Sequence, residues 1–241
     1  MRNCSDSSTS LPVAFAISRR YSTSFCTWTS VLAPDSLPGA KNISRVLLAS
    51  SNEGKLREFR EMAAGSAIEF DLLQDFRSLS SFEEAAPTFS ENSAGKALHY
   101  SQFTEEIVLA DDSGLVVPAF GGAPGVQSAR YAGPNATDAK RVEKLLAAMQ
   151  EITGERRCAR FVCVISLAQR GRTIAVVSDF VAGLIAAKPR GAHGFGYDPI
   201  FFSSELGRTF AEASEEEKNR ISHRGKAFRK VLGFLQGCQI L

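Results

Sequence analysis

The sequence predicts an α/β protein built around a long mixed β-sheet. Strand-like and helix-like segments alternate over residues 45–110, which favours parallel strands joined by crossover helices. Two long apolar runs follow at 159–168 and 172–186, separated only by residues 169–171, and this spacing predicts an antiparallel hairpin. A sheet that contains both kinds of pairing is mixed rather than purely parallel.

The first half of the chain reads as three buried strands separated by two helices. Short apolar runs predict strands at residues 45–49, 68–73 and 106–110. Helical spacing of apolar residues predicts helices at 55–63 and 90–103. The third strand stops directly before two aspartates, 111 and 112. We therefore expect this acidic pair at the carboxyl end of a strand, where α/β sheets bind ligands.

Three further helices are predicted in the second half. The first covers 137–150 and opens with a threonine N-cap. The second covers 214–221 and opens with Ser214 and Glu217, the S-x-x-E pattern of a capping box. The third covers roughly 223–236 and carries an apolar stripe on one face.

The first 42 residues differ in composition from the rest. They are rich in serine and threonine and hold four basic residues but only two acidic ones. This composition is typical of an organellar transit peptide, and a disordered leader is the alternative. We expect the folded domain to span residues 43–241. It would lie in an organelle matrix (mitochondrion or plastid) if the leader is a transit peptide, and in the cytoplasm otherwise.

Charge and cysteine content exclude several functions. Of 28 basic and 26 acidic residues, 24 of each sign lie in residues 43–241, and this balance argues against a broad nucleic-acid-binding face. No apolar run reaches the roughly 18 residues that span a bilayer, so no membrane partner is expected. Five unevenly spaced cysteines fit neither a disulfide framework nor a zinc site.

The link between the first strand and the first helix contains small polar residues, one glycine and one lysine. It reads SSNEGK over residues 50–55. Free backbone N–H groups at a helix N-terminus, together with the charge of Lys55, would bind phosphate. An ordinary capping box from Ser50 to Glu53, with Gly54 in a turn, explains the same residues equally well. The link is not a Walker P-loop, because no Ser or Thr follows the lysine.

Two pairs of acidic residues are candidates for metal binding or proton transfer. Asp111 and Asp112 at the end of a strand can hold Mg²⁺ or accept a proton from water. A simple Asp-Ser-Gly turn is the alternative interpretation. Glu83 and Glu84 precede the second helix, and on most protein surfaces such a pair is merely solvated.

Two later segments supply an aromatic surface and cations. The segment GAHGFGYDPIFF places Phe195 and Tyr197 where they can stack on a base, and Asp198 where it can accept from base N–H groups. The segment EEEKNRISHRGKAF brings together Lys218, His223 and Arg224. Such cations suit a phosphate or a purine oxygen. Each segment alone also fits a glycine-rich turn or a solvated helix face.

Seven segments together resemble the inosine triphosphate pyrophosphatases of the RdgB/HAM1 type. They are, in the family's order, LLASSNEGKLREF, FSENSAGKA, ADDSGLVV, GGAPGVQSARYAG, TDAKRVEKLL, GFGYDPIFF and EEKNRISHRGKA. The resemblance covers nearly all of residues 43–236. It implies a two-lobed α/β fold around a long mixed β-sheet with flanking helices, an active site in the cleft between the lobes, and a homodimer. It also implies Mg²⁺-dependent hydrolysis of noncanonical purine nucleoside triphosphates (ITP, dITP, XTP) to the monophosphate and pyrophosphate.

The resemblance also implies roles for individual residues. Asp112 would be the proton acceptor and a metal ligand, with Glu83 as the second carboxylate at the metal. The phosphates would lie on Ser50, Ser51, Asn52, Glu53, Gly54 and Lys55. The rest of the substrate would contact Ser113, Phe195, Gly196, Tyr197 and Asp198. Three cations would close over base and phosphate, namely Lys218, His223 and Arg224.

Two positions depart from the family pattern. Ser51 stands where the first loop of the family usually has glycine, and this is compatible only if the residue avoids positive φ. Residues 85–87 replace a usual Thr-Gly step, so the choice between Glu83 and Glu84 stays open. Two other functions also stay open: hydrolysis of modified pyrimidine triphosphates, and noncatalytic nucleotide sensing.

Overall fold

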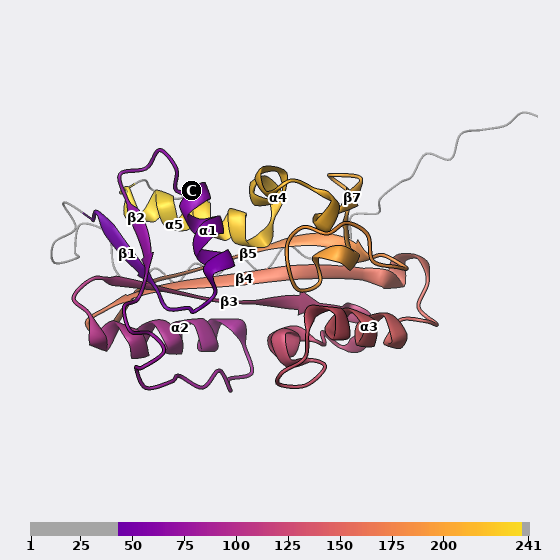
Figure 1. Ribbon diagram of the computed structural model, residues 1–241, viewed down its shortest axis with the longest axis horizontal. Coiled ribbons are helices and arrows are strands. Elements are labelled where there is room, and N and C mark those ends of the chain that lie inside the picture. Colours follow the sequence, from indigo (N-terminus) through magenta and orange to yellow (C-terminus); the bar gives the residue numbers. More distant parts are fainter. Residues whose placement is uncertain (1–42, 238–241) are drawn as a thin grey trace, which may run out of the picture.

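The computed structural model describes residues 43–237, and the expectations for the leader lie outside this range. It contains a seven-stranded mixed sheet, which confirms the predicted fold class. The strands are β1 (Arg45–Leu48), β2 (Glu69–Leu72), β3 (Ile107–Val116), β4 (Cys158–Gln169), β5 (Arg172–Ile185), β6 (Phe201–Ser203) and β7 (Arg208–Thr209). Their order is β2-β1-β3-β4-β5-β6-β7 (Figure 1). β1 pairs in parallel with β2 and β3, and all later neighbours are antiparallel.

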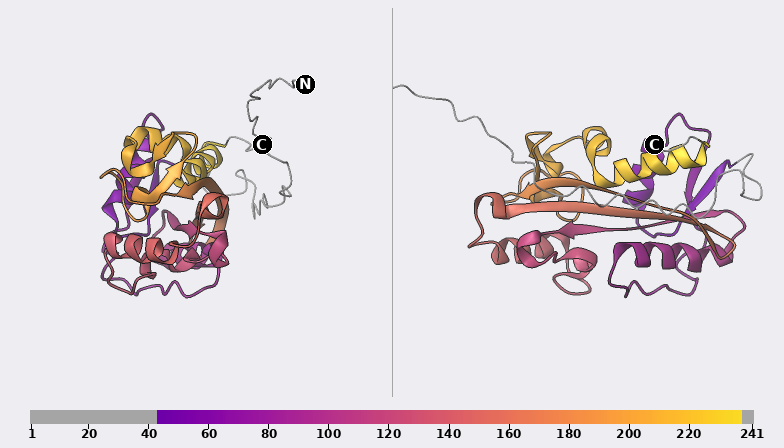
Figure 2. Two further views of the ribbon diagram at one scale, coloured as in Figure 1. Left: turned by 90° about the vertical axis from the view of Figure 1, so that its right-hand side faces the viewer. Right: turned by 180° about the vertical axis from the view of Figure 1, so that it is seen from behind.

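Helices lie on both faces of this sheet, as the two opposite views agree (Figures 1 and 2). On one side lie α2 (Phe89–Tyr100) and α3 (Asp138–Ala148). On the other side lie α1 (Glu53–Met62), α4 (Glu215–Ile221) and α5 (His223–Leu235). The short 3-10 helices are η3 (Ser101–Phe103), η4 (Pro118–Phe120), η5 (Gly125–Arg130), η6 (Gly154–Arg157), η7 (Asp198–Ile200) and η8 (Phe210–Glu212). All five predicted helices are present, with ends that differ by a few residues.

Local signals explain several of these ends. The β4–β5 hairpin turns at Arg170 and Gly171, which both have positive φ, as a two-residue hairpin turn that matches strand twist requires. The predicted capping box of Ser214 and Glu217 is formed at the start of α4. Thr137 caps α3 by accepting from a backbone N–H in its first turn.

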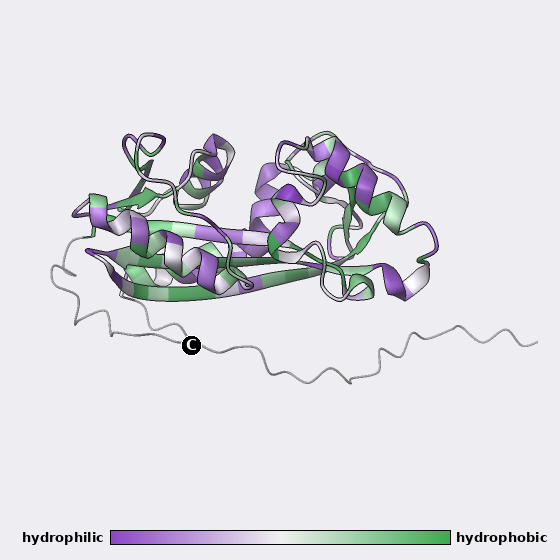
Figure 3. Cartoon of the chain, turned by 90° about the horizontal axis from the view of Figure 1, so that it is seen from below, coloured by the Kyte–Doolittle hydropathy of each residue, from purple (hydrophilic) through white to green (hydrophobic). Residues whose placement is uncertain are grey.

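Buried apolar side chains form two large clusters. The first surrounds Phe59 and Phe228, where α1 and α5 pack on the sheet. The second surrounds Phe161, Phe201 and Phe210. Figure 3 shows apolar colour along the long strands and hydrophilic colour on many outward helix positions. Among residues 43–237, no helix has the length and apolar character that a membrane crossing needs.

β3 is much longer than its parallel neighbour β1. Their pairing ends where Leu48 faces Leu109, and β3 then continues to Val116 beside β4 alone. The prediction that this strand stops before Asp111 and Asp112 is therefore wrong, because antiparallel pairing with β4 carries the backbone through them. The acidic pair nevertheless lies next to the end of β1. The β3 edge that faces β1 is open there.

Candidate active site

A cavity of about 520 Å³ lies beside this open edge of β3. Its walls come from the link after β1, the segment between β2 and α2, η5, and residues 195–198 and 218–224. These segments are far apart in the sequence, and the mixed sheet brings them together. The cavity therefore gathers residues from most of the segments that the sequence singled out.

The link from β1 to α1 forms one wall. Asn52 is the N-cap of α1: its side chain accepts from Lys55 N at 3.1 Å, and Ser50 Oγ accepts from Asn52 N at 3.1 Å. The alternative capping box from Ser50 to Glu53 is therefore not formed. Ser50, Asn52 and Lys55 line the cavity, whereas Glu53 is exposed and does not.

The same link presents unused backbone donors. Within the described residues, the N–H groups of Ser51, Glu53 and Gly54 have no protein acceptor. Ser51 has no positive φ, so serine fits this position as well as the usual glycine. Unpaired N–H groups at a helix N-terminus are suited to bind an anion.

Lys55 is anchored by a buried carboxylate. Its Nζ lies 2.8 Å from Asp111 Oδ1, and Arg224 lies 3.5 Å from the other oxygen. Burial alone would raise the pKa of Asp111, but the charges of Lys55, Arg224 and Lys96 outweigh it and hold the pKa well below its usual range. Asp111 therefore stays ionised and positions two cations beside the cavity.

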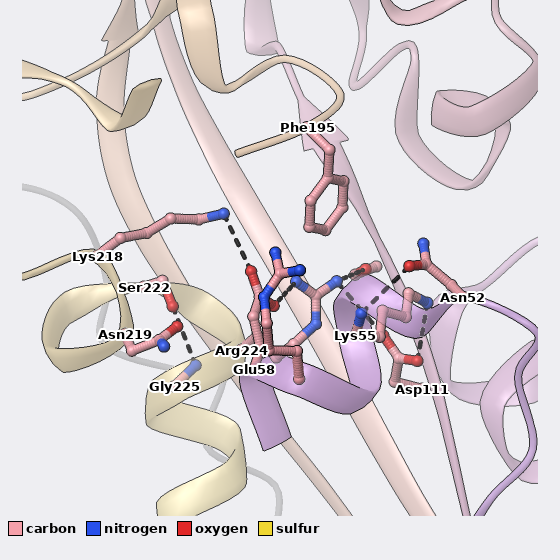
Figure 4. Close-up of polar contacts among 12 residues, drawn as sticks. Asn52, Lys55, Glu58, Asp111, Phe195, Lys218, Asn219, Ser222, Arg224 and Gly225 are labelled. Carbon is pink, nitrogen blue, oxygen red and sulfur yellow. Dashed lines mark hydrogen bonds and ion pairs between the residues drawn. The ribbon is translucent and has the colours of Figure 1, made fainter. Parts of the chain in front are cut away.

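A second buried carboxylate, Glu58 of α1, positions the remaining cations. It accepts from Lys218 at 3.2 Å and from Arg224 at 2.7 Å (Figure 4). Lys218 also lies 2.8 Å from Asp198. Burial would lower the pKa of Lys218, but Asp198 and Glu58 outweigh this effect and raise it, so the amine stays charged.

An aromatic ring lies over these cations. The Phe195 ring centroid is 4.8 Å from Lys218 Nζ and 5.4 Å from the Arg224 guanidinium (Figure 4). Asp198 shapes the turn that carries the ring, because it accepts from Phe195 N at 2.9 Å. Gly194 is required in this turn: it has positive φ, and an added Cβ would lie 2.1 Å from Asp198 Oδ2.

Two neighbours of Phe195 contribute mainly to the shape of the site. Tyr197 is buried and donates to Ser128 O at 3.0 Å, so its hydroxyl joins this wall to η5. Gly196 N donates to Asp138 Oδ2 at 2.7 Å. Both residues line the cavity, but the Tyr197 hydroxyl and the Gly196 N–H already form hydrogen bonds within the protein.

His223 is a neutral polar group in the cavity wall. It is buried and stacks on Phe161, with ring centroids 4.7 Å apart. Burial, reinforced by the charges of Arg224 and Lys218, lowers the pKa of His223 well below its usual value. Its Nδ1 has no partner among residues 43–237. This buried nitrogen therefore has an unused hydrogen-bonding capacity.

The carboxylates nearest Asp112 differ from the expectation. Glu83 is exposed, whereas Glu84 lines the cavity and pairs with Lys96. Burial, followed by the negative charge of Glu84, raises the pKa of Asp112 to about 6. The structure thus favours Glu84 over Glu83 as the partner of Asp112. Asp112 is buried and is not among the residues that line the cavity, whereas the next residue, Ser113, lines it and accepts from Arg224 at 3.1 Å.

Several residues of the site were not predicted from the sequence. They are Glu58, Lys96, Asn92 and the anchoring role of Asp111. Each lies in a segment whose sequence is typical of a helix or a strand. A lysine and an asparagine four residues apart on a helix rich in small residues were a usable signal for Lys96 and Asn92.

Free donors at a helix N-terminus, buried cations, an aromatic ring and nearby carboxylates form a site suited to a nucleoside polyphosphate in an α/β protein. The Ham1 family model matches residues 46–234, and the chain belongs to the Ham1 family. A dITP/XTP pyrophosphatase of Geobacillus kaustophilus is 46% identical over 189 residues, which cover 78% of this chain and 93% of that protein.

Two further comparisons agree. A dITP/XTP pyrophosphatase of Yersinia pseudotuberculosis is 44% identical over 196 residues, which cover 80% of this chain and 99% of that protein. The structure of a HAM1 protein from Coxiella burnetii superposes with a TM-score of 0.73 at 42% identity, and covers 80% of this chain and 98% of that one. The fold and the family therefore agree with those expected from the sequence.

Proposed function

We propose that this protein hydrolyses noncanonical purine nucleoside triphosphates (ITP, dITP, XTP) to the nucleoside monophosphate and pyrophosphate. The observation that carries the proposal is the single cavity that joins a phosphate-binding helix N-terminus to an aromatic, cationic wall. Glu84 lines this cavity, and Asp112 lies near enough to Glu84 for that charge to raise the pKa of Asp112. The relatives named as dITP/XTP pyrophosphatases support the same reaction.

The proposed roles follow from the charges of the site. The free N–H groups after β1, together with Lys55, would bind the phosphate chain, and Arg224 would neutralise charge that develops during cleavage. Both cations are already fixed by buried carboxylates, so little reorganisation is needed when the substrate binds. Asp112, with its raised pKa, would accept the proton of the attacking water.

The donor set around Asp112 fits Mg²⁺ as the cofactor. Mg²⁺ commonly uses one or two protein carboxylates and completes its coordination with phosphate oxygens and water. Asp112 and Glu84 supply such a pair, and residues 43–237 contain no group of three acidic, histidine or cysteine side chains that could hold a metal ion by themselves. We propose that these two residues hold the metal, which would neutralise the phosphates and lower the pKa of a bound water.

Base selectivity would depend on His223 and Arg224. Hypoxanthine and xanthine carry an oxygen at position 6, which accepts hydrogen bonds, whereas adenine carries an amino donor there. Nδ1 of neutral His223 can donate to that oxygen in one tautomer, and the Arg224 guanidinium lies beside it. An adenine would offer no acceptor to His223 Nδ1, and such mispairing discriminates by about 10⁴-fold.

The first experiment measures pyrophosphate release by the full chain with Mg²⁺ from ITP, XTP, GTP and ATP. We expect fast release from ITP and XTP only, and its loss in Asp112→Asn. Release from modified pyrimidine triphosphates instead would favour the related pyrimidine enzyme. Nucleotide binding that survives Asp112→Asn, without turnover in the wild type, would favour a sensor.

We also propose a homodimer formed by the open face of the β4–β5 hairpin. Phe180 and Leu184 lie on one face of β5 and are 46% and 37% exposed. Arg160 of β4 covers the Phe180 ring only in part, at 5.3 Å. Exposed apolar side chains on one sheet face are typical of an interface. Sedimentation tests this: Phe180→Glu should shift the protein from dimer to monomer.

A further inference from the structure

A second aromatic surface lines the same cavity. It consists of Phe76 and Phe82, from the segment between β2 and α2, and of Tyr100 at the end of α2. Binding of the base and the phosphates, as proposed above, uses none of these three side chains. We call these three side chains the second aromatic surface. Because it lines the cavity, it could contact a part of the ligand that lies beyond the phosphates.

We propose that this surface binds an aromatic group attached to the terminal phosphate of the substrate. The enzyme would then also hydrolyse nucleoside triphosphates whose γ-phosphate is esterified by an aromatic or base-bearing alcohol, the chemistry of dinucleoside polyphosphates. This inference rests on the proposed function. It adds a subsite and a substrate class to the same catalytic centre.

The sheet order places this surface opposite the base wall. Phe76 and Phe82 follow β2 at one edge of the sheet, and Phe195 precedes β6 near the other edge. The phosphate-binding link after β1 and Lys96 line the same cavity, and β1 lies between β2 and β3 in the sheet. A nucleotide with its base at Phe195 and its phosphates at that link therefore extends its terminal phosphate toward the second aromatic surface.

The three side chains hold one another in place, and Tyr100 itself is buried. The Phe76 and Tyr100 rings pack with centroids 4.6 Å apart, and Phe82 N donates to the Tyr100 hydroxyl at 3.3 Å. The Phe82 ring lies so close to Gly95 that an added Cβ would be 2.6 Å from it. Phe76 and Phe82 are nevertheless only half-buried. A phosphate chain gains nothing from apolar ring faces, whereas an aromatic group stacks on them.

Lys96 marks the transition from phosphate to aromatic binding. It lies one helical turn before Tyr100 and pairs with Glu84, two residues after Phe82. The terminal phosphate would thus lie at Lys96, and an aromatic group attached to it would lie at the adjacent second aromatic surface.

The reaction with such an ester balances like that with the free triphosphate. Water attacks the α-phosphorus and forms a new P–O bond, and its proton passes to Asp112. The bond from the α-phosphorus to the oxygen that bridges to the β-phosphorus breaks. That oxygen leaves with the electron pair, and the products are the nucleoside monophosphate and the aryl ester of pyrophosphate.

Two probes test the subsite: ITP esterified at the γ-phosphate with phenol, and phenyl pyrophosphate. We expect the full chain with Mg²⁺ to cleave the ester at least as efficiently as ITP. Phe82→Ala should lower the ratio of the two kcat/KM values by about tenfold, because a stacked ring is lost. The matched control is Phe103→Ala, since Phe103 touches Tyr100 but is outside the cavity and should leave the ratio unchanged.

Calorimetry with phenyl pyrophosphate and pyrophosphate gives a readout without turnover. The phenyl group should tighten binding about tenfold in the wild type, and Phe82→Ala should remove the gain. Phe76→Ala provides the same test if Phe82→Ala fails to fold. Equal binding of the two ligands, or an ester-to-ITP ratio unaffected by both variants, would overturn the subsite. If ITP is not hydrolysed but phenyl pyrophosphate still binds more tightly than pyrophosphate, only the proposed function would be overturned.

Discussion

Asn92 donates from Nδ2 to Asp112 Oδ2 across 3.0 Å and holds the neighbouring acidic segment at the same time. Its Oδ1 accepts from Ala86 N at 2.9 Å, and its Nδ2 also lies 3.3 Å from Ala86 O. Asn92 is only 1% exposed, so water does not compete for these bonds. One amide thus fixes Asp112 and the segment that carries Glu84 relative to each other.

Replacing this amide should reduce turnover more than substrate binding. We expect Asn92→Ala to lower kcat for ITP by about 10- to 100-fold with little change in KM, because a residue that orients a reacting group is lost. Steady-state kinetics measure the split. Ser90→Ala, at an exposed position of the same helix, is the control. Wild-type kcat in a folded Asn92→Ala protein would contradict the positioning role.

Glu58 should be essential to stability, because it neutralises two buried cations. Glu58→Gln leaves Lys218 and Arg224 with less compensation, and we expect a loss of about 3 kcal/mol in the free energy of unfolding. Urea denaturation measures it. The adjacent Arg57 forms an exposed pair with Glu215, so Arg57→Gln should cost at most about 0.5 kcal/mol. Equal losses in the two variants would contradict this account.

The Mg²⁺ concentration that the enzyme needs should change when Glu84 is replaced but not when Glu83 is replaced. Glu84 lines the cavity and Glu83 is exposed, so only Glu84→Gln should raise the Mg²⁺ concentration needed for half-maximal activity, by about tenfold or more. A Mg²⁺ titration at saturating ITP measures this value for both variants. A larger effect of Glu83→Gln would restore the residue first expected from the sequence.

Stability should depend on pH through His223. Its pKa is lowered in the folded protein, so the folded state binds fewer protons than the unfolded state below the ordinary histidine pKa. The stability that neutral His223 contributes is complete above about pH 6.5 and is lost as the pH falls from there, by at most about 1.4 kcal/mol per pH unit.

The measurement compares wild type with His223→Phe, which keeps a ring beside Phe161. Asp112, with a raised pKa, acts in the opposite direction, but it does so in both proteins. We therefore expect the difference in unfolding free energy between them to change in favour of His223→Phe as the pH falls. Exposed His193 supplies the control variant His193→Gln, which should follow the wild type. Parallel curves for wild type and His223→Phe would refute the prediction.

The elements of the fold were largely predictable from the sequence, because apolar periodicity and capping residues act locally. The S-x-x-E pattern at Ser214 and the hairpin predicted across residues 169–171 are examples. The length of β3 was not predictable in this way. Asp111 and Asp112 look like the end of an apolar run, and only their pairing with β4 and with distant cations allows a strand to continue through them.

The chemistry of the site was predictable only in part, for a similar reason. Lys55, Lys218 and Arg224 were expected from the sequence as cations of the site, but their anchors Asp111 and Glu58 were not. The Glu58–Arg224 pair joins residues 166 positions apart. Its side chains meet only because α1 and α5 pack on the same face of the sheet.

The location of the active site depends on the difference in length between β1 and β3, because β3 continues past the point where β1 ends. Each further residue in β1 would extend that strand by about 3.3 Å along β3. Two inserted residues after Leu48 would therefore pair with the backbone at Asp111 and fill the opening from within the sheet. Catalysis would be lost with every side chain of the site still present, and a shorter neighbour is thus as much a requirement of this enzyme as any acidic or basic group.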